Sequence, residues 1–294
     1  MKKILISLVA ALSLGSFAVS AQTFSALENG QYTVSVGDVT LTVDASRGGK
    51  IISYKYQDTE ILSQTRMPNS FGSTFWTSPQ SEWNWPPVAE YDRNPFTAEV
   101  KDNVLVLTGA KSERFGYRVR KEFKADAKNN SIAITYTIVN ESGQTRKVAP
   151  WEISRVPNGG MLFFDAKEAT PANNMKGLPF VYEKKAAWYI LDEDKDNRKI
   201  NADGKGWLAF SDNGLLFVKK FQDLKAGEEA PAEGEIQIYA NPGKTFVEIE
   251  EQGAYTTLQP GEELDWTVTW YLVAHDLENE PSKALLKLAQ KIVK

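Results

Sequence analysis

The sequence contains no cysteine and only one histidine, His275, among its 294 residues. Without cysteine, no disulfide can brace the fold in an oxidising compartment, so its stability must come from the core. A single histidine excludes a three-histidine metal site, and its place just after an expected strand favours a surface or capping role. A Gly-rich phosphate loop is also missing. We therefore expect no metal and no cofactor.

The sequence also lacks any run of lysine or arginine, and its formal net charge is −4. A mildly acidic surface without a basic patch argues against nucleic acid or anionic lipid as a partner.

One apolar stretch stands apart, at the N-terminus. Lys2 and Lys3 precede an apolar segment from Ile4 to Val19, and Val19-Ser20-Ala21 offers the small side chains that signal peptidase accepts. The segment is too short to span a bilayer, so we predict a cleaved signal peptide at residues 1–21 and no membrane insertion afterwards. The predicted mature domain, residues 22–294, is periplasmic or secreted. Because cleavage removes two lysines and no acid, its formal net charge is −6.

Apolar residues alternate with a period of two through most of the remaining sequence, as in 32–36, 132–138 and 266–272. β-Branched and aromatic residues dominate these segments, and Gly, Asn and Asp separate them at short intervals. Only the last segment has helical spacing, with Pro281 near its start and Leu285, Leu288 and Ile292 following. The pattern predicts one all-β domain, a many-stranded antiparallel sandwich with a short C-terminal helix.

Two irregular stretches, 67–95 and 166–205, are expected to be long loops, which in compact β proteins are often functional. The first contains Trp76, Trp83 and Trp85 within ten residues, with Gln80 among them. Flat aromatic faces beside polar groups suit a sugar, whose ring has C–H patches on its faces and hydroxyls around its edge. The alternative is that these indoles only plug one end of the sandwich.

Two strands carry further candidates. In 148–156, alternation places Trp151 and Arg155 on one face and Glu152 on the other, where Glu152 is either solvated or inside a pocket. In 246–252, Glu248 and Glu250 share one face; taken alone, such an acidic strand is more often a protected sheet edge than a site.

The acidic loop 192–198 has Asp at positions one, three and five of a calcium loop. It lacks the glycine at position six, and position twelve is Asp203 instead of Glu. A solvated loop is the preferred interpretation.

Several segments, in this order, resemble the galactose mutarotase-like (aldose 1-epimerase-like) superfamily, and within it a branch of exported bacterial proteins. They are 47–56 with Gly-Gly-Lys-Ile-Ile-Ser, 72–87 with Phe-Trp-Thr-Ser-Pro-Gln and Trp-Asn-Trp-Pro-Pro, 136–140, the Trp151-Glu152 strand, and 249–262. The resemblance covers most of the predicted mature chain. It implies a large antiparallel supersandwich with a broad groove for carbohydrate.

In mutarotases a late Glu acts as general base on the anomeric hydroxyl and a His on a central strand acts as general acid. By resemblance, Glu250 matches the Glu, whereas the strand that should carry the His reads Pro150-Trp151-Glu152. This departure favours binding over turnover. A carboxylic acid replaces the His only if its pKa is raised, for instance if Glu152 faces Glu250 across the groove.

Three hypotheses follow. The first is an exported carbohydrate-binding protein without efficient turnover, in which Trp76, Trp83, Trp85 and Trp151 stack on the sugar and Gln80, Glu152, Arg155 and Glu250 bind its hydroxyls. The second is a sugar-active enzyme, either aldose 1-epimerase-like or a glycan-processing enzyme with Glu152 and Glu250 as its two carboxylates. The third is an envelope scaffold whose tryptophan loop contacts a protein.

Overall fold

The computed structural model describes residues 22–241, 243 and 245–294. The predicted signal peptide, residues 1–21, lies outside the described residues.

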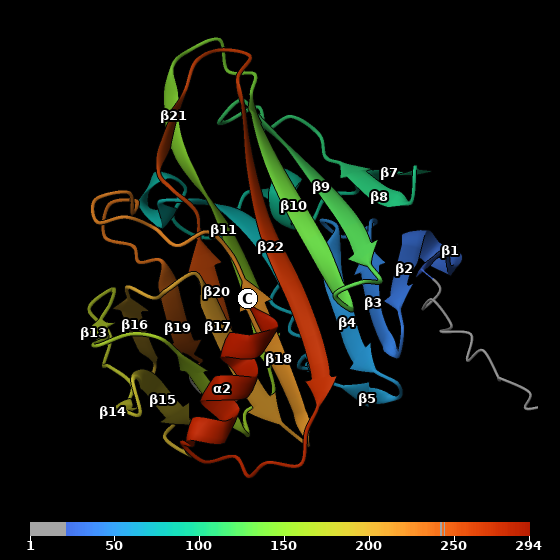
Figure 1. The fold of residues 1–294 in the computed structure, drawn as a ribbon. Coiled ribbons are helices and arrows are strands. Elements are labelled where there is room, and N and C mark those ends of the chain that lie inside the picture. Colours follow the sequence, from blue (N-terminus) through green and yellow to red (C-terminus); the bar gives the residue numbers. More distant parts are fainter. Residues whose placement is uncertain (1–21, 242, 244) are drawn as a thin grey trace, which may run out of the picture.

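A twelve-stranded sheet forms one layer of the molecule (Figure 1). Its strands lie in the order β1-β2-β3-β4-β6-β11-β20-β19-β16-β13, with β5 beside β4 and β21 beside β11. Their bounds are β1 Gln22–Ala26, β2 Gln31–Val36, β3 Val39–Asp44, β4 Lys50–Tyr56, β5 Thr59–Glu60, β6 Ser73–Ser78, β11 Arg146–Val156, β13 Thr170–Pro171, β16 Arg198–Ala202, β19 Ile236–Ala240, β20 Val247–Gln252 and β21 Thr256–Leu258.

A ten-stranded sheet forms the second layer, in the order β14-β15-β12-β17-β18-β22-β10-β9-β8-β7. Its bounds are β7 Thr97–Lys101, β8 Val104–Thr108, β9 Tyr117–Asp126, β10 Ser131–Asn140, β12 Met161–Phe164, β14 Val181–Glu183, β15 Ala186–Ile190, β17 Trp207–Asp212, β18 Leu215–Lys220 and β22 Glu263–Ala274. The named strands pair antiparallel throughout both sheets, which confirms the predicted all-β sandwich.

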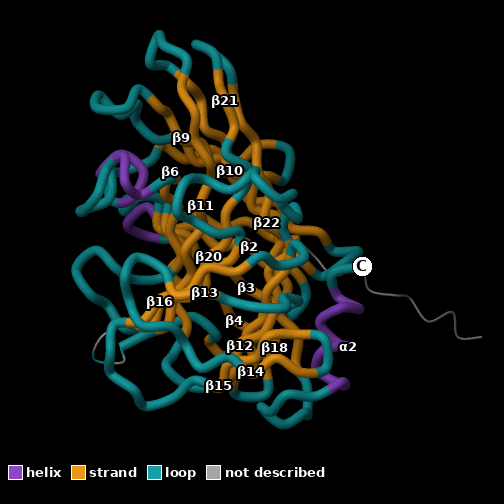
Figure 2. The backbone as a smooth tube through the Cα atoms, turned by 90° about the vertical axis from the view of Figure 1, so that its left-hand side faces the viewer, coloured by secondary structure: helices purple, strands orange, loops and turns teal. Residues whose placement is uncertain are grey.

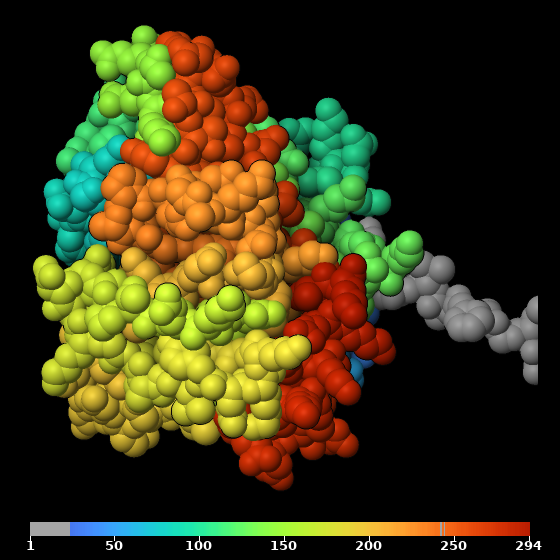
Figure 3. All heavy atoms as spheres, turned by 60° about the vertical axis from the view of Figure 1, so that its left-hand side comes forward, coloured from blue at the N-terminus to red at the C-terminus, as the bar shows by residue number. Residues whose placement is uncertain are grey.

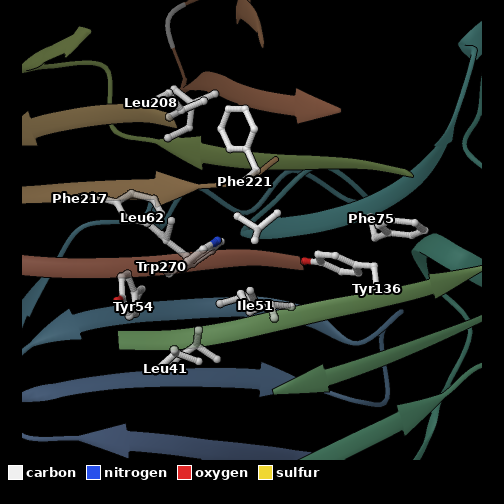
Figure 4. Close-up of a cluster of buried hydrophobic side chains, with 14 of the residues drawn as sticks. Leu41, Ile51, Tyr54, Leu62, Phe75, Tyr136, Leu208, Phe217, Phe221 and Trp270 are labelled. Atoms are coloured by element: carbon white, nitrogen blue, oxygen red, sulfur yellow. The ribbon is translucent and has the colours of Figure 1, made fainter. Parts of the chain in front are cut away.

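The main hydrophobic core lies between the sheets and draws on both. In β22 the alternation works as predicted, because Trp266, Val268, Trp270 and Leu272 are buried in one continuous cluster. Tyr54 of β4 meets Trp270 edge to face, with ring centroids 5.2 Å apart, as the close-up of this core shows (Figure 4).

The predicted C-terminal helix is α2 (Lys283–Ile292), which begins after Ser282, whose Oγ accepts a hydrogen bond from the Leu285 N–H. Leu285, Leu286 and Ala289 pack in a second hydrophobic cluster, which also holds Trp188 and Trp207 of the ten-stranded sheet. In the space-filling view the red C-terminal segment lies against the yellow middle of the chain (Figure 3). Among the described residues, no helix is both long enough and apolar enough to cross a membrane.

Three short helical turns were not expected from the sequence: η1 (Glu28–Gly30), η2 (Gln80–Glu82) and α1 (Ala89–Asp92). The two stretches expected to be loops are also partly regular, because β6 lies within the first and β13, β14, β15 and β16 lie within the second. Gly72 allows β6 to enter the sheet, since its φ is +60° and a Cβ there would lie 2.1 Å from the Ile51 carbonyl oxygen.

The interpretation of 246–252 as a sheet edge is wrong. β20 lies in the middle of the larger sheet, between β11 and β19, where every residue of the strand is buried. Its acidic side chains therefore need a different explanation.

Candidate functional site

A pocket of about 400 Å³ opens on the outer face of the larger sheet, by which we mean the face turned away from the ten-stranded sheet. Figure 2 shows the strands that form its floor, β6, β11, β20 and β16, on the side turned to the viewer. The aromatic residues that line it are Trp76, Trp85, Trp151, Tyr239 and Phe246, and the charged or amide residues are Gln80, Asn173, Lys199, Asn241, Glu248 and Glu250.

The tryptophans of the floor are fixed by their neighbours. Trp76 and Trp151 are opposite each other on β6 and β11, and their rings meet edge to face at 5.3 Å. Trp76 Nε1–H donates to Asp92 Oδ1 at 3.0 Å, and Asp92 is in turn held by Lys50 and Thr74. Both indoles are thus fixed by protein contacts. Trp76 is only 6 % exposed and Trp151 only 1 %, so they form the closed floor of the pocket, and the predicted stacking on a sugar is left to Trp85 at its mouth.

Glu250 stands at the base of the pocket and is 1 % exposed. Its Oε2 accepts a hydrogen bond from Trp151 Nε1–H at 2.9 Å and another from Lys199 Nζ at 3.2 Å. Among the described residues, Oε1 has no hydrogen-bond partner. Burial raises the pKa of Glu250 to about 7, with Lys199 opposing the rise and Glu248 adding to it. A buried, unpaired carboxyl oxygen in a pocket requires a polar group from a ligand or from water.

Glu248, two residues earlier on the same face, is already paired. Arg155 NH2 lies 2.6 Å from Glu248 Oε1, and the guanidinium is 5.3 Å from the centre of the Phe246 ring. Arg155 is itself 1 % exposed and does not line the pocket. Its predicted contact with substrate is therefore replaced by an indirect role, in which it orients Glu248 from behind.

Lys199 and Tyr239 were missed by sequence reasoning. Lys199 lies on β16 and Tyr239 on β19, directly opposite each other, and the Lys199 Nζ is 4.9 Å from the centre of the Trp151 ring. Burial raises the pKa of Tyr239 to about 12, so its hydroxyl keeps its proton. The sequence does carry a strand signal here, because polar Lys199 and Asn201 alternate with apolar Ile200 and Ala202, but the irregular pattern of 166–205 as a whole predicts a loop.

Glu152 is not in this pocket, which corrects the predicted pairing with Glu250 across a groove. It is opposite Glu251 on β20, and both side chains point between the sheets, where they are 0 % exposed. Glu152 accepts hydrogen bonds from Tyr136 Oη and Trp270 Nε1, both of the other sheet, and pairs with Lys219 at 2.7 Å. Alternation along β11 causes this: with Trp151 in the pocket, its neighbour must face the interior.

The remaining predicted residues divide between the pocket and its support. Gln80 and Trp85 line the pocket together with Trp76 and Trp151. Trp83 is 2 % exposed and lies behind Trp76 and Trp151, with its Nε1–H donating to the Thr77 carbonyl at 2.8 Å. Only Trp85, at 61 %, is widely exposed. The exposed aromatic patch that the scaffold hypothesis requires is thus reduced to one residue.

His275 is arranged for structure and not for nucleophilic chemistry. Its Nδ1 accepts a hydrogen bond from the Leu277 N–H at 3.1 Å, so the ring proton is on Nε2, which lies 3.1 Å from Ser211 Oγ. A protonated Nε2 donates to the serine and cannot take its proton, which excludes a Ser-His nucleophile pair here.

Two clusters of carboxylate side chains are of the kind that can bind a cation. In the loop 192–198, Arg198 donates to both oxygens of Asp192 at 2.8 and 3.0 Å. The arginine thus occupies the carboxylate that a calcium ion would need. Asp203, Asp223 and Glu235 have carboxylate oxygens within 4.8 Å of one another. The Glu235 oxygens, however, accept the N–H groups of Gly204 and Leu224, so that side chain has a structural role.

The two packed sheets and the pocket on the larger one define a large antiparallel β-sandwich with a pocket on its outer face. No family model matches the chain, and no curated protein matches it in sequence. Solved structures do match it. One is a galactose mutarotase-like protein from Clostridium acetobutylicum, at 11 % identity and a TM-score of 0.58, over 87 % of this chain and 99 % of that chain.

A galactose 1-epimerase from Lactobacillus acidophilus matches at 12 % identity and a TM-score of 0.53, over 87 % of this chain and all of that chain. A GalM/aldose epimerase homologue from C. elegans matches at 8 % identity and a TM-score of 0.57, over 87 % of this chain and 100 % of that chain. At these identities the likeness concerns the fold. The chain has the galactose mutarotase-like fold, which confirms the fold prediction.

Proposed function

We propose that this chain is an exported carbohydrate-binding protein, periplasmic or secreted, that holds a sugar in the outer-face pocket without efficient turnover. The observation that carries the proposal is Glu250: its Oε1 is buried and has no hydrogen-bond partner in the part of the chain that the structure describes, and Trp76, Trp85 and Trp151 line the same pocket. A sugar hydroxyl would donate to this oxygen while the ring lies against an indole. The export part of the proposal depends on residues 1–21 alone.

At pH above about 7, where Glu250 is ionised, replacing it by glutamine is expected to weaken sugar binding by about 10- to 100-fold, because a hydrogen bond to a charged group is worth about 1.5–3 kcal/mol. Calorimetric titration with a panel of neutral, amino and acidic sugars measures this. Glu113→Gln changes an exposed glutamate outside the pocket and is the matched control. Equal affinities for wild type and Glu250→Gln, or no binding of any sugar by wild type, would contradict the proposal.

Turnover of the aldose 1-epimerase type is the second candidate, and it is favoured by the pKa of Glu250. A carboxyl that titrates at about 7 is suited to act as a general base near neutral pH. Lys199, 3.2 Å away, and Tyr239 carry the nearby protons. The two-carboxylate version loses support because Glu152 faces the interior. Polarimetry on freshly dissolved α-D-glucose and α-D-galactose separates the candidates: a catalysed rate that disappears in Glu250→Gln establishes turnover.

A further inference from the structure

A second pocket, of about 420 Å³, adjoins the first. Four residues line both: Gln80, Trp85, Asn173 and Met175. We call the pocket at Glu250 the inner pocket and the second one, which is also lined by Ser81, Asn84, Pro231 and Glu233, the outer pocket. Because the shared residues form a common boundary, a ligand can extend from one into the other.

Trp85 stands at this boundary. Its ring meets that of Trp76 edge to face, at 6.1 Å and 83°, yet the residue stays 61 % exposed. Most of its indole surface is therefore free to contact a ligand. Trp85 lines both pockets, so its exposed surface borders the space that a ligand would occupy.

The boundary is built rigidly and is tied to the floor of the inner pocket. Glu233 Oε1 accepts the Gln80 backbone N–H at 3.0 Å, and Glu233 Oε2 accepts from Gln237 Nε2 at 2.9 Å. Gln237 is opposite Glu250 on the neighbouring strand. Through these bonds the turn that carries Gln80 and Ser81 is fixed relative to Glu250, so the two pockets keep one spacing.

The chemistry of the two pockets differs in a way that fits a chain of sugars. The inner pocket has a buried carboxyl, a buried ammonium group and fixed indoles, which can specify one terminal unit. The outer pocket offers Trp85 together with the exposed side chains of Ser81, Asn84 and Asn173. Such a surface can stack on a sugar ring without selecting one sugar over another.

We infer that the inner and outer pockets together form one cleft for a glycan of at least two units, with the terminal unit at Glu250 and the next unit against Trp85. This inference rests on the proposed function and names its ligand class. Because the units are covalently joined, contact of the second follows at high effective concentration once the first is bound, so a disaccharide should bind at least about ten times more tightly than its monosaccharide.

Calorimetric titrations with matched pairs test this: D-glucose with maltose and cellobiose, D-galactose with β-1,4-galactobiose, and N-acetylglucosamine with N,N′-diacetylchitobiose. For the sugar that binds, we expect a disaccharide-to-monosaccharide affinity ratio of at least about ten. In Ser81→Trp, where a bulky side chain fills the outer pocket, the ratio should fall to near one. Ser25→Trp, at an exposed serine of β1, should keep the wild-type ratio. Thermal unfolding of both variants confirms that they are folded.

The outcomes separate the two claims. A ratio near one in wild type overturns the inference and leaves the proposed function standing. A high ratio that Ser81→Trp does not change also overturns it, because the second unit then lies elsewhere. No binding of any member of the panel overturns the proposed function and the inference with it.

Discussion

Replacing Lys219 by methionine is expected to lower the free energy of unfolding by about 3–5 kcal/mol, the largest effect we predict for a single substitution. Lys219 Nζ lies 2.7 Å from Glu152 and 2.6 Å from Glu251, and all three side chains are 0 % exposed. Burial raises the pKa of Glu251 well above its usual range, with Lys219 opposing and Glu152 adding to the rise. Removal of the ammonium group takes away the cation that forms a salt bridge with both buried carboxyl groups.

Urea unfolding, followed by tryptophan fluorescence, measures the loss. Lys220→Met is the matched control, because Lys220 is the next residue on β18 but only half-buried, and we expect it to cost less than about 1 kcal/mol. Adding Glu251→Gln to Lys219→Met should recover part of the stability, since the second buried carboxyl becomes a neutral amide. Similar losses for Lys219→Met and Lys220→Met would show that the buried cluster does not stabilise the fold in this way.

The buried cluster of Lys219, Glu152 and Glu251 also supports the strands that carry the pocket. Glu152 follows Trp151 on β11, and Glu251 follows Glu250 on β20, so the interior charges hold the same two strands whose outer faces carry the site. Lys219 links them both to the ten-stranded sheet through β18.

The second large effect is on the pH dependence of stability. The pKa of Glu250 is raised from 4.5 to about 7 on folding, so the folded state keeps a proton that the unfolded state loses. The stabilisation from this proton is therefore fully present below pH 4.5 and is lost as pH rises through about 7. At 1.36 kcal/mol per pKa unit the change is on the order of 3 kcal/mol.

Comparison of wild type with Glu250→Gln isolates this contribution. We expect the stability of wild type to fall relative to the variant between pH 4.5 and 8, by about 3 kcal/mol in total. Glu251 and Glu235, whose pKa values are also raised, are present in both proteins and cancel in the difference. Urea unfolding at half-unit pH intervals gives both curves. Parallel curves would mean that Glu250 titrates near its ordinary pKa.

Much of the fold follows from local pattern, because alternation fixes which residues share a strand face. The shared strand face of Glu248 and Glu250, the alternation of buried residues in β22 and the helix α2 were all predicted in this way. Strand order is different, since it depends on contacts distant in sequence. Nothing local to 246–252 tells whether the strand is central or at an edge, and β20 proved central.

The residues of the candidate site were predicted only in part, because local pattern does not give the contacts between distant strands. Trp76, Gln80, Trp85, Trp151 and Glu250 meet in one pocket, as the clustered aromatic and polar residues indicated. Glu152 was wrongly paired with Glu250, because alternation gives two faces but does not say which one meets the second sheet. Lys199 comes from a short strand in an irregular stretch, and only tertiary structure brings it beside Glu250.

The most direct test of the central claim, that the outer-face pocket binds a sugar, is NMR of the indole N–H groups during titration with the sugars named above. The chain has eight tryptophans, and Trp76, Trp85 and Trp151 line the pocket. Trp188 and Trp207 pack in the cluster beneath α2 and serve as internal controls. We predict that the Trp85 and Trp151 signals shift in a saturable way while those of Trp188 and Trp207 stay in place. No shift of the pocket signals with any sugar, or shifts confined to Trp188 and Trp207, would contradict the claim.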